Sequence, residues 1–373
     1  MKLLAAIDSF KGSIGSQEAN EIVKQALPQH EVETFPIADG GEGTVEALVA
    51  LLEGKKITES ITGPNKERIQ GVLGWVEKDR LAIVEVAEGA GITKVPTDSL
   101  DPTQHTSYGV GEQIRSALDL GAKEIIIGLG GSATVDGGIG LLQALGVEFY
   151  DDADQLLPIL PIHLAAVKRI NLEKMDSRLR NVAITVASDV NNPLCGSNGA
   201  TYVFGPQKGI LEEDLEEFDQ GMKSYQEVVN KATNTHYETT LGAGAAGGIG
   251  FALYSFLNAS FESGLHLLAE KGHLAEKIDQ VDMVITGEGK FDTQSLSGKV
   301  PIGISRLAKE KNIPVIIFCG SAEGDKIELP EENIAAIIPI IDQPMTLETA
   351  IKKGPELLNR AVKRTFHLIA LTD

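Results

Sequence analysis

Short apolar runs, each bounded by turn residues, recur near both ends of the chain. They occupy residues 2–7, 32–37, 281–286, 314–319 and 334–341. Runs of this length are typical of strands buried on both faces of a parallel sheet. Between them, apolar residues recur at spacings of three and four, as in amphipathic helices. This alternation predicts a doubly wound α/β sheet with two early and three late strands.

The middle of the chain shows a different pattern. Residues 70–76 and 81–86 alternate between apolar and polar positions around Lys78 and Asp79, which predicts an antiparallel hairpin. Further apolar runs at 124–128 and 182–187 predict strands that alternate with helices. The middle therefore predicts a second α/β domain whose sheet is mixed.

This second domain is predicted to span residues 63–275 and to be inserted into the first, which comprises residues 1–62 and 276–373. The boundaries are predicted to within about ten residues, because the ends of elements are the least determined part of a sequence pattern. Ligand sites often lie where domains meet, so the active site is expected in the cleft between the two.

The composition excludes several classes of protein. The chain has 373 residues with 33 basic and 53 acidic side chains, which gives a formal net charge of −20. Because nucleic-acid binding needs a clustered basic face, no nucleic-acid partner is expected. A hydrophobic content of 42% with 23% charged residues is ordinary for a globular protein and argues against bulk disorder.

The cysteines and the first apolar run together predict a cytoplasmic protein. Cys195 and Cys319 are too few for a disulfide framework, which suits a reducing compartment. The run that begins at Leu3 stops at Asp8, short of the roughly 7–15 residues of a secretory h-region. No stretch approaches the ~20 apolar residues that cross a bilayer, so no membrane partner is expected. The sequence leaves the oligomeric state, including a homo-oligomer, open.

Glycine is over-represented, with 40 residues, or about 11% against an average near 7%. More than half of these glycines fall in the five segments 39–43, 128–140, 196–209, 242–250 and 287–298. Most of these segments follow a predicted strand or precede a predicted helix, where open α/β proteins bind ligands. Because glycine also lets backbone amides approach an anion closely, the glycine-rich segments are the candidate site.

Two early segments carry charged side chains just after predicted strands. Asp8, Ser9 and Lys11 follow the first strand, and they indicate either a functional site or local caps of a polar loop. Asp39 and Glu42 stand among glycines after the second strand. Two carboxylates there suit Mg²⁺ or substrate hydroxyls, or else a solvated turn that caps the next helix.

The strongest pattern is the segment 124–140, where an apolar run leads through a glycine-rich loop into a predicted helix. This order is typical of a phosphate-binding loop, with a packing role as the alternative. The loop is not a Walker A motif, which needs a Lys followed by Ser or Thr. The candidate phosphate contacts are Gly130, Gly131, Ser132, Ala133 and Thr134.

Later segments add further candidate chemistry. Asp189 follows a predicted strand, the usual position of a catalytic base or metal ligand. Residues 242–247 formally match G-x-G-x-x-G, but no buried strand precedes them, so close helix packing is the better interpretation. The segment 286–301 suits an anionic substrate with a metal ion, or a surface ion-pair loop. Its charged members are Glu288, Lys290, Asp292 and Lys299.

These segments, in this order, resemble the bacterial type I glycerate kinase family. The resemblance runs from residue 1 to about residue 320 and rests on residues 8–13, 38–44, 128–134, 189, 192–196, 204–209, 242–248, 287–289 and 292. It implies two α/β domains, one of them flavodoxin-like. It also implies an enzyme that moves the γ-phosphoryl group of ATP to a hydroxyl of D-glycerate, with Mg²⁺ as cofactor, in glycerate and glyoxylate catabolism.

Each candidate residue can be given a hypothetical role in this reaction, beyond what the resemblance itself fixes. The predicted catalytic residues are Asp189, Lys11 and Asp8, with Asp189 as the base that takes the hydroxyl proton. The amides of residues 130–134, helped by Lys11 or Lys299, are expected to hold phosphates. The predicted metal ligands are Asp39, Glu288 and Asp292, and the predicted substrate contacts are Ser9, Lys208 and Lys290. The 2-hydroxyl is favoured over the 3-hydroxyl as the acceptor.

Two other functions remain open from the sequence. An NAD(P)-dependent 2-hydroxy-acid dehydrogenase would use residues 242–247 for a dinucleotide, and it would change NADH absorbance with glycerate. A non-catalytic regulator that binds glycerate or a nucleotide could lose its catalytic carboxylates, whereas this chain keeps Asp189, Glu288 and Asp292.

Overall fold

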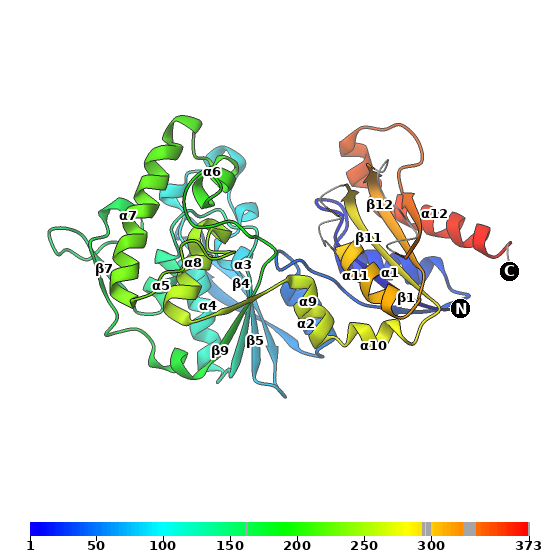
Figure 1. Cartoon of the computed structure of the whole chain (residues 1–373), viewed down its shortest axis with the longest axis horizontal. Helices are drawn as coiled ribbons and strands as arrows, with labels where there is room; N and C mark the ends of the chain where they lie inside the picture. The colour runs from blue at the N-terminus through cyan, green and yellow to red at the C-terminus, as the bar shows by residue number, and fades with distance from the viewer. Residues whose placement is uncertain (161–162, 293–294, 296–299, 324–332, 372–373) are drawn as a thin grey trace. The chain divides into compact units, whose positions relative to one another are not determined.

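The computed structural model describes residues 1–160, 163–292, 295, 300–323 and 333–371 (Figure 1). The chain divides into two compact units. Unit 1 comprises Met1–Asp39, Ala50–Leu52 and Leu265–Asp373, and unit 2 comprises Gly40–Val49 and Glu53–Gly264. The domain boundaries expected from the sequence remain a prediction, separate from this division into units. Within the described ranges, no helix has the length and apolar character needed to span a bilayer.

Unit 1 is built on a parallel sheet. Over the part of the chain that is described, its strand order is β2-β1-β11-β12-β13. Renumbered within the unit, this is the order 2-1-3-4-5 of flavodoxin-like sheets, so the predicted doubly wound fold is confirmed. Its elements are β1 (Lys2–Ile7), α1 (Ser16–Ala26), β2 (Glu31–Thr34), α9 (Gly264–Lys271), α10 (Leu274–Ile278), β11 (Met283–Phe291), α11 (Val300–Glu310), β12 (Val315–Ala322), β13 (Ile334–Pro339) and α12 (Leu347–Ile369).

Helices cover both faces of this sheet, as apolar strand residues on each face require. On one face, α1 and α12 share a buried cluster with the strands, including Val23, Leu358 and Phe318. On the other face, α11 packs against β11 and β12 through buried residues such as Ile302 and Ile304. The sheet is therefore enclosed, and its strand ends are where a ligand can reach it.

Unit 2 is built on a mixed sheet with the order β10-β9-β6-β5-β4-β3. Strands β5, β6, β9 and β10 are parallel, and β3, β4 and β5 pair antiparallel, which confirms the predicted hairpin and mixed sheet. Its elements are α2 (Thr44–Leu51), β3 (Lys55–Thr62), β4 (Arg68–Val76), β5 (Leu81–Glu85), α3 (Val86–Ala90), α4 (Tyr108–Asp119), β6 (Glu124–Gly128), α5 (Ile139–Ala144), β7 (Glu148–Tyr150), β8 (Arg169–Asn171), β9 (Ala183–Ala187), α6 (Ala200–Phe204), α7 (Leu215–Thr233), α8 (Ala245–Leu257) and β10 (Ser260–Glu262).

Several predicted strands end elsewhere in the structure, and two of these differences bear on the site. The second strand stops at Thr34, three residues before its predicted end at Ile37. The first of the three late strands, predicted to end at Thr286, continues as β11 to Phe291, because Lys290 and Phe291 still pair with β12. Glu288 and Lys290 are consequently strand residues, and the predicted charged loop begins only after Phe291.

Candidate functional site

A cavity of about 480 Å³ lies in unit 1, where β1, β11 and β12 reach their carboxyl ends. The polar residues predicted as parts of a site meet there: Asp8, Ser9, Lys11, Asp39, Glu288 and Lys290. Strand β1 pairs with β2 on one side and with β11 on the other. The sequence order of the strands therefore reverses at β1, and such a switch point is where open α/β sheets bind ligands.

Three carboxylates of this cavity repel one another. Desolvation and the charges of Asp39 and Glu288 raise the pKa of Asp8 to about 7, although the Ser9 N–H donates a hydrogen bond to Asp8 Oδ1 at 2.7 Å. Glu288 is only 7% exposed. Clustered carboxylates of this kind suit a divalent cation, whose preferred ligands are carboxylate oxygens. The donor set therefore fits Mg²⁺.

The two lysines of the cavity are in different situations. Lys11 is exposed, and within the described ranges no acidic side chain lies within ion-pair distance of it. Lys290 Nζ lies 3.3 Å from Asp292 Oδ2 and 2.9 Å from a carboxylate oxygen of Glu323. Asp292 is not among the described residues that line the cavity. Lys299, a predicted phosphate contact, falls outside the described residues.

The glycine-rich loop lies in unit 2, directly after β6. Its outer edge is held by two backbone hydrogen bonds, from the Ala133 N–H to Ala90 O at 2.8 Å and from the Ile92 N–H to Gly131 O at 2.7 Å. Among the described residues, nothing accepts a hydrogen bond from the N–H groups of residues 130–132. Three consecutive unpaired amides of this kind are suited to binding an anion.

Asp189 lies beside this loop within unit 2. It stands two residues after β9, whose last residue Ala187 is in register with Gly128, the end of β6. The Leu129 N–H also donates a hydrogen bond to Ala187 O at 3.1 Å, which ties the two strand ends together. Asp189 is exposed. The predicted base and the predicted anion loop thus follow neighbouring ends of one sheet.

Lys208 ends the short 3₁₀ helix Pro206–Lys208 and lies beneath the glycine-rich loop. Its side chain is 3% exposed, and Nζ donates hydrogen bonds of 2.8 Å to Ser132 Oγ and to Thr134 O. Desolvation lowers the pKa of Lys208 to about 7, partly opposed by Asp136. Because both acceptors belong to the loop, we propose that Lys208 holds the loop in shape, in place of the substrate contact predicted from the sequence.

Replacement of Lys208 by Met is expected to change how stability depends on pH. Between about pH 7 and pH 10.5, the unfolded chain binds more protons at this position than the folded chain, so wild-type stability should rise with pH. In Lys208→Met this contribution disappears, and the gain in unfolding free energy over that range should shrink. Urea unfolding at the two ends of the range measures it, with the exposed Lys231→Met as control. Equal gains in wild type and Lys208→Met would contradict the burial of a neutral amine.

Two buried carboxylates of unit 2 were not predicted from the sequence. Asp136 accepts hydrogen bonds from Ser107 Oγ at 2.6 Å and from the N–H groups of Ser107, Gly138 and Gly140 at 3.0–3.2 Å. Glu85 ends β5 and accepts from the Val45 N–H at 2.6 Å, at the start of α2. Burial raises the pKa of Glu85 to about 7. The sequence signals that could have indicated them were weak: Glu85 is an acidic residue at the end of a strand, and Asp136 is an acidic residue inside a glycine-rich run.

The segment 242–250 serves close packing. A Cβ atom on Gly247 would lie 2.0 Å from Thr134 O, and the Gly137 N–H donates a hydrogen bond to Gly247 O at 3.0 Å. Gly247 also has a φ of +68°. This segment thus supports the glycine-rich loop from behind. The backbone at Gly247 is already in contact with the glycine-rich loop. A dinucleotide phosphate, which a G-x-G-x-x-G turn would bind, therefore has no room there.

Gly247→Ala is expected to destabilise the protein by more than the ~1–2 kcal/mol cost of a left-handed conformation, because the new methyl group would also collide with the Thr134 carbonyl. Gly196→Ala is the matched control, since Gly196 has a φ of +86° but no atom within 4 Å of the position that a methyl group would take. Thermal melting measures both variants. Equal losses in the two would mean that backbone conformation alone accounts for the effect.

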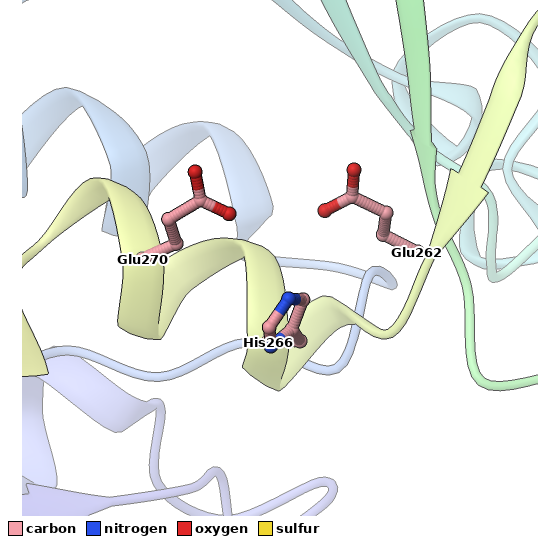
Figure 2. A group of neighbouring side chains, drawn as sticks. All are labelled: Glu262, His266 and Glu270. Carbon is pink, nitrogen blue, oxygen red and sulfur yellow. The ribbon is translucent and has the colours of Figure 1, made fainter. Parts of the chain in front are cut away.

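Two other groups, the Cys195 thiol and a cluster that includes His266, are weak candidates for a functional site. Burial, with the charge of Asp219, raises the pKa of Cys195 to about 12, so its thiol stays protonated and is a poor nucleophile. His266 and Glu270 lie one turn apart on α9 and are exposed, and Figure 2 shows them with Glu262, the last residue of β10. Since Glu262 belongs to unit 2 and α9 continues into unit 1, the three side chains do not define a metal site within one unit.

The fold and site define an α/β protein that carries a carboxylate cluster at the switch point of a flavodoxin-like sheet. The sequence model of the glycerate kinase family matches residues 3–370. Glycerate kinase of Bacillus subtilis is 39% identical over 367 residues, 97% of this chain and 96% of that protein. Glycerate 2-kinase of Escherichia coli is 38% identical over 375 residues, covering 100% and 98%. The chain belongs to the glycerate kinase family.

A solved structure supports the same assignment. The crystal structure of a protein described as glycerate kinase 2 from Salmonella typhimurium LT2 matches with a TM-score of 0.86 at 38% sequence identity. The match covers 100% of this chain and 99% of that one. The family predicted from the sequence is thereby confirmed, and the chain is an enzyme of that family.

Proposed function

We propose that this enzyme transfers the γ-phosphoryl group of ATP to the 2-hydroxyl of D-glycerate, giving 2-phosphoglycerate. The family and the names of its relatives support a glycerate kinase, and the Escherichia coli relative is named a glycerate 2-kinase. The reaction would supply phosphoglycerate from glycerate, as in glycerate and glyoxylate catabolism. Two cysteines without a disulfide support a cytoplasmic location.

The observation that carries this proposal is the cavity of unit 1, where three carboxylates and Lys11 converge at a strand switch point. Phosphoryl transfer needs charge neutralisation and positioning more than covalent chemistry. Asp8, Asp39 and Glu288 would hold Mg²⁺, which would supply positive charge to offset that of the phosphates. Lys11 adds a cation that no acidic side chain of the described ranges pairs with directly. In a chain with a net charge of −20, this local arrangement makes an anion site.

Unit 2 supplies the other half of the chemistry in this proposal. The amides of residues 130–132 can bind an anionic group of a substrate, and Lys208 and Asp136 keep the loop in place from beneath. Asp189 is the proposed base that accepts the hydroxyl proton as the oxygen attacks phosphorus. Ser9 lines the cavity of unit 1 and would donate a hydrogen bond to a ligand there.

The test is nucleotide turnover that depends on the acceptor. Purified enzyme with ATP and Mg²⁺ should form ADP only when D-glycerate is added, as followed by a coupled assay. L-glycerate and 3-hydroxypropanoate are the matched controls, since 3-hydroxypropanoate lacks the 2-hydroxyl that is the proposed acceptor. ADP formation that ignores the acceptor, or no ADP with D-glycerate, would overturn the proposal.

A further inference from the structure

The apolar face of α12 lies in two different environments along the length of the helix. Its later part is buried in the core of unit 1, through residues such as Leu358 and Val362. Residues spaced by three or four share a helix face, so the same stripe continues toward the start of α12 as Ile351 and Leu347. Ile351 is 36% exposed and Leu347 is 77% exposed, and both line the cavity that holds Asp8 and Glu288. The apolar stripe therefore continues past the core and over the site.

Other apolar residues extend this wall. Ile340 and Ile341, just after β13, line the same cavity, and Ile341 is 37% exposed. We call Ile340, Ile341, Leu347, Ala350 and Ile351 the apolar wall. The charged side chains and the apolar wall are thus parts of one cavity in one unit.

The wall is held against the loop that follows β1. Ser13 Oγ donates a hydrogen bond to Ile351 O at 2.6 Å. A Cβ atom on Gly354 would lie 2.1 Å from Ser13 Oγ, so glycine at this position lets the helix come close to the loop. Lys11 belongs to the same loop. The spacing between the apolar wall and the charged end is consequently fixed by direct contacts.

A cavity with one apolar side and one charged side fits a ligand that has both characters. Glycerate is polar throughout and has nothing to cover an apolar wall, whereas a nucleotide carries a flat, largely apolar base and a polyanionic end. The volume of about 480 Å³ lies in the usual range of small-molecule sites. When a ligand covers exposed apolar side chains grouped in a concave site, the removal of their surface from water contributes favourably to the free energy of binding.

We propose that the apolar wall of unit 1 receives the nucleoside of ATP, with the phosphates directed toward Lys11 and the cation held by Asp8, Asp39 and Glu288. This inference rests on the proposed kinase function and assigns the nucleotide to unit 1. It leaves the anion loop of unit 2 for the acceptor. The wall, with no role in the phosphoryl transfer itself, then sets nucleotide affinity.

The double variant Leu347→Ser, Ile351→Ser tests the proposal. Losing two apolar contacts with the base should raise the KM for ATP about tenfold or more, with little change in kcat or in the KM for D-glycerate. Leu368→Ser is the matched control, because Leu368 is an exposed leucine of α12 that does not line the cavity. A serine at these exposed sites leaves the core residues of the helix intact.

A binding measurement separates this proposal from the kinase function. Calorimetry with MgATP, in the absence of glycerate, should show the same tenfold weakening, whereas binding of magnesium tripolyphosphate should not change. Unchanged MgATP binding in the double variant would overturn the proposal, as would a rise confined to the KM for glycerate. The proposal would also be overturned if the wild type were a dimer, the double variant were a monomer, and the two bound MgATP equally well. The apolar wall would then contact a second copy of the chain. An inactive enzyme that still binds MgATP through the wall would refute only the kinase function.

Discussion

Asp189→Asn is expected to lower kcat by about 10²–10⁴-fold, the usual contribution of a general base. The carboxylate at this position would accept the proton of the attacking hydroxyl, and an amide cannot. Asp189 is exposed and lies two residues after the end of β9, so this nearly isosteric substitution should leave the melting temperature unchanged. Steady-state kinetics with saturating MgATP measure the effect, and the dependence on Mg²⁺ should stay as in wild type.

A matched control is Asp152→Asn, which removes another exposed carboxylate of unit 2. It should keep kcat within about twofold, because surface charges far from a site have small effects. A near-normal kcat for Asp189→Asn would exclude this residue as the base. A loss of activity that is accompanied by a lower melting temperature would indicate a structural role instead.

Asp8→Asn and Glu288→Gln should each raise the Mg²⁺ concentration needed for half-maximal activity by at least about 10–100-fold, since each removes a proposed ligand. The same variants should melt at equal or higher temperature without metal. Asp8 is held among the charges of Asp39 and Glu288, and removing one of three clustered carboxylates relieves repulsion. Activity and stability are thus expected to move in opposite directions.

The increase in melting temperature that Mg²⁺ and ATP give to the wild type should be lost or reduced in these variants, because a ligand stabilises only the state that binds it. Glu323→Gln is the matched control. Glu323 lies beside Lys290 but is not among the described residues that line the cavity. Variants that melt lower than wild type and keep the same response to Mg²⁺ would contradict a metal site at these carboxylates.

Much of the framework could be predicted from the sequence because strand and loop signals there are strong. Buried strands such as β1 and β6 were predicted with their bounds, since turn residues follow each of them directly. Their carboxyl ends carry the predicted site residues Asp8 and the glycine-rich loop. Parallel pairing explains the main difference: β11 runs on through Glu288 because β12 continues to pair with it, which only tertiary contacts decide.

Other features depend on contacts that no local pattern encodes. The burial of Lys208 requires a loop that lies 74–76 residues earlier in the chain. Glu85 meets Val45 across 40 residues, so its role at the start of α2 could not be recognised. The apolar stripe of α12 predicts a helix, but its periodicity does not say that its first turns line a cavity. A periodic pattern predicts that one face of a helix is apolar. Which residues or cavity that face meets is decided by the tertiary fold.

We propose that the enzyme phosphorylates the 2-hydroxyl of D-glycerate with ATP. Phosphorus NMR of a reaction with MgATP and D-glycerate tests it most directly, because it identifies the product and its position together. A new phosphomonoester signal coupled to a single proton, at the expense of ATP and with the appearance of ADP, is predicted for 2-phosphoglycerate. A signal coupled to two protons would show 3-phosphoglycerate and contradict the assigned acceptor, and the absence of any phosphomonoester would contradict the kinase itself.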